Sequence, residues 1–74
     1  MLNIQKLTAP TLGNPLKVDL GNNKTATITR VDNKHGAVFN ISIDKNGELL
    51  FESNRRGVGA WESIKDDLYI NIDK

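Results

Sequence analysis

Apolar and polar residues alternate through the middle of the chain. The segments TATITRV (25–31) and AVFNISI (37–43) carry apolar side chains at every second position, and ELLF (48–51) follows them. Period-two alternation of β-branched and aromatic residues is typical of half-buried strands. Turn residues separate the three segments, and Asn46-Gly47 before the last segment is a strong hairpin signal. The pattern predicts a three-stranded antiparallel meander in which Gly47 adopts a positive φ angle.

A further strand precedes the meander. Residues 16–20 alternate apolar and charged side chains, and a Gly-Asn-Asn turn follows them. Residues 1–14 mix scattered apolar residues with Pro10, which excludes a central strand in that stretch. We therefore expect an irregular arm at 1–14, with at most a short edge strand, and a half-buried strand after it.

The C-terminal segment combines two periodicities. Trp61, Ile64 and Leu68 recur at helical spacing, whereas the residues from Leu68 to Ile72 alternate with period two. Both patterns hold if a short turn of helix near 61–67 passes into a final strand. Such a strand at a sheet edge would expose unpaired backbone groups and favour self-association.

Together these elements predict a single mainly β domain, residues 1–74, with one short helix. We expect a curved antiparallel sheet or small open barrel of four to five strands, built around the central meander. The predicted core consists of Val18, Leu20, Ile28, Phe39, Ile41, Ile43, Leu49, Phe51, Trp61, Ile64, Leu68 and Ile70.

Composition narrows the classes of function. The 74 residues include no cysteine, which excludes disulfides and thiolate metal sites. The ten basic and nine acidic residues give a net charge of +1, too even a balance for bulk attraction to nucleic acid or to a membrane. The sequence shows no apolar membrane span and no signal-peptide pattern, so we expect a cytoplasmic protein. Frequent Asn, Ile, Lys and Asp residues suggest a low-GC bacterium or its phage.

The segment NRRGVGAWESI (54–64) allows two interpretations. Gly57 and Gly59 before a helix could expose backbone N–H groups to an anion, with Arg55 and Arg56 as charged partners. The alternative is a plain turn in which both arginines face water. Neither a Walker A motif nor a dinucleotide-binding motif is present, so the sequence favours the turn. The segment remains a candidate contact for a partner or an anion, with Trp61 expected to anchor the core rather than lie exposed.

Catalytic and metal chemistry find no support in the sequence. His35 is the only histidine, and a single imidazole without cysteine does not form a usual zinc site. No nucleophile and base pair can be named around it, because Asp32 and Ser42 fall on a turn and a strand that do not converge. We expect no enzyme, no catalytic residue, no metal and no cofactor.

A local basic patch is the remaining candidate site. It would consist of Lys24, Arg30, Lys34 and His35, joined by Arg55 and Arg56 if the first hairpin and the 53–59 loop lie at the same end. With Trp61 as an outward stacking platform, such a patch could bind a nucleic acid strand.

Two functions follow from these observations. The favoured one is a small non-enzymatic interaction module that binds a protein partner or itself, of a size typical of phage or mobile-element accessory proteins. The alternative is a small β-fold nucleic-acid-binding protein that uses the basic patch with Trp61. No small-molecule substrate and no membrane partner are inferred.

Overall fold

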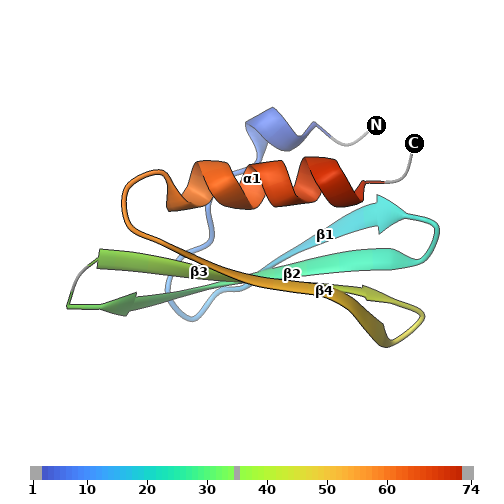
Figure 1. Ribbon diagram of the computed structural model, residues 1–74, viewed down its shortest axis with the longest axis horizontal. Coiled ribbons are helices and arrows are strands. Elements are labelled where there is room, and N and C mark those ends of the chain that lie inside the picture. Colours follow the sequence, from blue (N-terminus) through green and yellow to red (C-terminus); the bar gives the residue numbers. More distant parts are fainter. Residues whose placement is uncertain (1–2, 35, 73–74) are drawn as a thin grey trace.

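The computed structural model describes residues 3–34 and 36–72. Its elements are a 3-10 turn η1 (Ile4–Lys6), the strands β1 (Leu16–Gly21), β2 (Lys24–Asn33), β3 (Gly36–Lys45) and β4 (Glu48–Arg56), and the helix α1 (Ala60–Asn71). The strands form one antiparallel sheet in the order β1-β2-β3-β4, and α1 crosses one face of it (Figure 1). The predicted fold class is confirmed: the structure is mainly β with one short helix. The sheet is open rather than closed into a barrel, so β1 and β4 form its two edges.

Short turns with positive φ angles join the outer hairpins. Asn46 and Gly47, at φ 53° and 84°, connect β3 to β4, so the positive φ predicted for Gly47 is confirmed. Asn22 and Asn23, at φ 51° and 65°, connect β1 to β2 in the same way. Two successive positive φ angles give the turn geometry that matches the twist of paired strands. These Asn and Gly residues therefore fix each strand beside its neighbour in the sequence.

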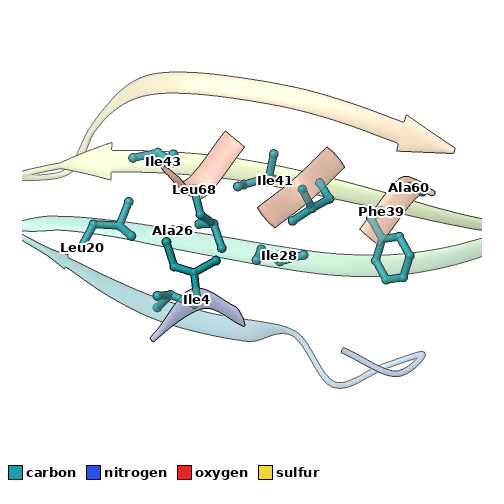
Figure 2. Close-up of a cluster of buried hydrophobic side chains, with 11 residues drawn as sticks. Ile4, Leu20, Ala26, Ile28, Phe39, Ile41, Ile43, Ala60 and Leu68 are labelled. Atoms are coloured by element: carbon teal, nitrogen blue, oxygen red, sulfur yellow. The ribbon is translucent and has the colours of Figure 1, made fainter. Parts of the chain in front are cut away.

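The two faces of the sheet differ in character. Cross-strand pairs such as Ile28 with Ile41 and Ala26 with Ile43 lie under α1 and are fully buried. Figure 2 shows these side chains between the strands and the helix, with Ile4 of η1 covering the β1 side. The opposite face carries hydroxyl, amide and charged side chains, among them Thr27, Asn40 and Glu52, and no described helix or strand lies over it (Figure 1). The hydrophobic core is therefore a single layer on one side of the sheet.

Helix α1 replaces the final strand that the sequence predicted. Ala60, Ile64 and Leu68 are buried at four-residue spacing and form the helix stripe that packs on the sheet. Ile70 is 77% exposed, so the period-two pattern from Leu68 onward does not describe a strand. The side-chain Nζ of Lys24 donates to the backbone oxygen of Asn71 at 2.8 Å, which satisfies a carbonyl at the helix C-terminus. The strand prediction was wrong because Leu68 and Ile72, four residues apart, fit a helix, while Ile70 between them made the same segment fit a strand.

Strand β4 is longer than predicted and bends near its start. The sequence suggested 48–51, but the strand continues to Arg56 because its second half pairs with β3. A shift in register beside Ile43 leaves Leu50 as an extra residue between two paired positions. Leu49 and Leu50 are each 53% exposed. The core positions predicted for Leu49 and Ile70 are therefore wrong, since the bulge and the helix turn both side chains outward.

Candidate functional site

Arg55 lies at the end of β4 and forms a bidentate ion pair with Asp67 of α1. Its Nε donates to Oδ2 of Asp67 at 3.0 Å, and its Nη2 donates to Oδ1 at 2.7 Å. The Asp67 side chain is only 3% exposed, whereas that of Arg55 is partly open to solvent. The hydrogen bond to Asp67 and the charge of that carboxylate raise the pKa of Arg55. The Arg55 side chain is 41% exposed, as expected in part, but its guanidinium is not a free charge, because it neutralises a buried carboxylate of α1.

Trp61 of α1 packs against the buried ring of Phe39 on β3. Its ring centroid is 5.7 Å from that of Phe39, and the guanidinium carbon of Arg30 lies 5.8 Å from the Phe39 ring on β3. Arg30 also donates from Nε to Oδ1 of Asp32 at 3.0 Å. Trp61 is half-buried against the core. Arg30 and Trp61 are thus joined through Phe39 in a packed cluster, not arranged as separate exposed platforms.

The other candidate basic residues do not gather on one face. Lys24 begins β2 and contacts the end of α1, whereas Lys34 follows the far end of the same strand, about 30 Å away at the usual strand rise. Arg56 is exposed, and as the neighbour of Arg55 in β4 it points to the opposite face of the sheet. His35 lies outside the described residues. The turn after β2 and the start of the 53–59 loop do lie at the same end of the sheet, because Asn33, Arg56 and Gly57 line one hollow, so Lys34 and Arg56 share that end. Lys24 lies at the other end, so the basic residues that the structure describes do not all join in one patch.

The glycine segment between β4 and α1 is a turn with its own internal hydrogen bonds. Gly57 and Gly59 adopt φ angles of 85° and 83°. The N–H of Gly57 donates to the oxygen of Ala37 at 3.3 Å, and the N–H of Ala60 donates to the oxygen of Gly57 at 3.2 Å. Two of the N–H groups that an anion cradle would need are thus engaged within the chain. The arrangement matches the turn interpretation, with the glycines supplying positive φ angles.

The best-formed hollows on the described surface are small. A hollow of about 210 Å³ on the uncovered face is lined by Thr27, Thr29, Asn40, Ile41, Ser42, Glu52 and Ser53. Two others have volumes of about 140 and 240 Å³. All three fall below the roughly 300 Å³ at which pockets for small organic ligands begin. Within residues 3–34 and 36–72, no group of His, Asp or Glu side chains has a metal-binding arrangement. None of the described helices is long and apolar enough to cross a membrane.

The outer edge of β4 presents a different kind of site. This nine-residue strand pairs with β3 on one side, and the sheet ends on the other. Arg56 lies opposite Val38 of β3. The next pair in the same register is Gly57 with Ala37, and here the N–H of Gly57 donates to the oxygen of Ala37. Hydrogen-bonded and non-hydrogen-bonded pairs alternate in an antiparallel ladder. Arg56 therefore directs its backbone N–H and C=O away from β3.

The same alternation applies along the strand. Glu52, Asn54 and Arg56 are every second residue of β4, so all three occupy non-hydrogen-bonded positions toward β3 and direct their backbone N–H and C=O groups away from it. No backbone hydrogen bond from another described element reaches them. We call these three residues the β4 edge. Sequence reasoning missed this site because it placed 53–59 in a loop. Residues 52–56 are all polar, so no alternation of apolar and polar residues signalled the second half of the strand.

Three exposed aliphatic residues belong to β4 and α1. Leu49 and Leu50 begin β4. Ile70 follows Asp67 by three residues on α1, and Asp67 contacts Arg55 of β4. Leu49 and Leu50 thus place exposed apolar surface at the start of β4, whereas Ile70 lies on the exposed side of α1, away from the buried stripe of Ala60, Ile64 and Leu68.

The fold and the site together define a small four-stranded antiparallel meander that is covered by a helix on one face and has an open outer strand. Comparison with known protein families, with curated proteins and with solved structures finds no match to this chain.

Proposed function

We propose that this chain is a small protein-interaction module, rather than an enzyme, and that it accepts an extended protein segment along the β4 edge. The observation that carries the proposal is the outward row of backbone donors and acceptors at Glu52, Asn54 and Arg56. Adding a strand to an open sheet edge is a common mode of peptide recognition, in which main-chain hydrogen bonds supply affinity.

The surroundings of the β4 edge support this use. The strand is held from behind by β3 and from above by the bidentate Arg55–Asp67 ion pair, so it is positioned before any partner arrives. Leu49 and Leu50 of the same strand offer exposed apolar surface next to the backbone groups. A rigid edge with nearby apolar side chains lowers the ordering cost of binding and adds side-chain contacts.

A pair of substitutions at Asn54 tests the proposal directly. Proline at this position removes the outward N–H, and edge strands tolerate proline where that group faces solvent. Alanine removes the same side chain but keeps the N–H. We expect linear peptides selected from a random phage-displayed library to bind the natural chain and the Asn54→Ala variant, but not Asn54→Pro. Thermal melting of both variants checks that each remains folded.

Hydrogen exchange gives a second measurement that needs no variant. A selected peptide should slow exchange at the amides of Glu52, Asn54 and Arg56, while the amides of Phe51 and Ser53 already pair with β3 and should change little. Peptides that protect β1 instead, or that bind the proline variant equally well, would contradict the assignment to the β4 edge.

A further inference from the structure

We infer that the segment which occupies the β4 edge is the β4 edge of a second copy of this chain. This inference rests on the proposed function, because it identifies the partner of the same site. Two copies related by a twofold axis perpendicular to the sheet would pair their β4 strands antiparallel and join the two sheets into one. Both helices would then lie on the same face of the combined sheet.

The bulge in β4 limits the registers available to such a pair. Leu50 is the extra residue, so regular pairing is confined to the part of the strand beyond it. A twofold axis at Glu52 would place two Glu52 carboxylates opposite each other. It would also pair Asn54 with the bulged residue Leu50. An axis at Asn54 avoids both problems.

The register centred on Asn54 is complementary in charge and in hydrogen bonding. Glu52 of each copy lies opposite Arg56 of the second copy, twice in the dimer, and Asn54 lies opposite itself. All three residues direct their backbone groups outward, so each of these pairs is of the hydrogen-bonded type. The side chains of Glu52 and Arg56 are exposed and make no described ion pair within the chain. Opposite charges placed directly across two strands stabilise the pairing.

Strand β1 is the other edge and is less suited to this role. It has six residues against nine in β4. Its centre also carries opposite charges, Lys17 and Asp19, but Asp19 already accepts a hydrogen bond from the N–H of Gly21 at 2.9 Å. The arm residue Ile4 packs on the β1 side of the core. The β4 edge is therefore the longer edge with uncommitted charges.

A charge swap tests both the dimer and its register. The dissociation constant is measured by sedimentation equilibrium over a concentration series that reaches the millimolar range. Glu52→Arg alone and Arg56→Glu alone each place like charges opposite each other twice, and each should weaken the dimer about ten-fold or more. The double variant restores opposite charges and should return close to the natural dissociation constant.

Lys17→Glu is the matched control, because it makes the same change in net charge as Arg56→Glu on the same sheet face, at the other edge. It should leave the dimer unchanged. A weakening equal to that of Arg56→Glu would show bulk repulsion or pairing through β1, and failure of the double variant to recover would exclude the register. Concentration-dependent protection of the Glu52, Asn54 and Arg56 amides provides a readout that requires no variant.

The two proposals can fail separately. A chain that stays monomeric throughout the concentration series but binds selected peptides at the β4 edge would overturn the second copy as the occupant and leave the interaction module intact. A chain that neither dimerises nor binds peptides there would overturn both.

Discussion

At the scale of single residues, the ion pair between Arg55 and Asp67 matters most. A carboxylate that is 3% exposed is costly to bury without a close cationic partner, and the bidentate guanidinium of Arg55 supplies one. Asp66 and Asp67 lie in the second half of α1, toward its C-terminus, which is an unfavourable place for negative charge. Arg55 resolves this conflict for Asp67, and Lys24 adds a positive charge beside the C-terminal carbonyl of Asn71.

Replacing the two arginines one at a time should separate their roles. Arg55→Ala leaves the Asp67 carboxylate buried without its partner, so we expect the melting temperature to fall by several degrees. Arg56→Ala removes an exposed side chain of equal size and charge from the adjacent position, and it should leave the melting temperature nearly unchanged.

The double variant Arg55→Ala/Asp67→Asn removes the uncompensated charge as well. It should be more stable than Arg55→Ala alone, because a neutral amide is less costly to bury than a carboxylate. Equal melting temperatures for Arg55→Ala and Arg56→Ala would show that the ion pair contributes nothing to the stability of the fold.

At the scale of elements, α1 is the part where sequence and structure disagree most. The buried stripe of Ala60, Ile64 and Leu68 was visible as helical spacing, but Ile70 and Ile72 suggested a strand. Local pattern could not decide, because the choice depends on which side chains the sheet covers. The middle strands were predictable, since alternation in β2 and β3 extends over ten residues each and a register slip would expose the whole apolar set.

Two isoleucines of α1 should respond differently to substitution. Ile64 is fully buried, so Ile64→Val should lower the free energy of unfolding by about 0.5–1.5 kcal/mol. Ile70 is exposed on the same helix, and Ile70→Ala should have little effect or stabilise slightly, because alanine is the better helix former. Urea denaturation measures both. A large loss for Ile70→Ala would instead support the buried strand that the sequence suggested.

The candidate site was only partly visible in the sequence. Arg55, Arg56, Gly57, Gly59 and Trp61 were singled out together, but the structure sends Arg55 to Asp67, Arg56 to the opposite face and the glycines into a turn. The open edge could not be predicted, because an edge is defined by what does not pair with it. Strand order, unlike strand propensity, is a property of the assembled sheet.

At the scale of the whole molecule, the distribution of charge bears on the nucleic-acid alternative. Lys24, Arg30 and Arg55 each contact a group within the chain, and Lys34 lies at the far end of β2 from Lys24. Affinity for a nucleic acid strand depends on neutralising several adjacent phosphates at once. The described basic residues do not form a continuous track for that purpose.

We therefore expect no saturable binding of a fluorescently labelled single-stranded oligothymidylate at low salt, measured by anisotropy. A single-strand-binding protein assayed alongside serves as the positive control. Binding whose affinity falls linearly with the logarithm of salt concentration, and which is lost with Lys34→Ala, would favour the nucleic-acid function over the interaction module.

The order of elements along the chain has a consequence for synthesis. All four strands precede α1, so they leave the ribosome first. Hairpins form within microseconds, whereas translation at about 5–20 residues per second needs about a second or more to add the turn and the helix. During that interval the isoleucines of β2 and β3 have no cover on the side where α1 will lie (Figure 2). A nascent or truncated chain that ends near Arg56 thus exposes a bare apolar face as well as its strand edges. Such a chain presents that apolar face to solvent until the twelve-residue helix α1 closes over it.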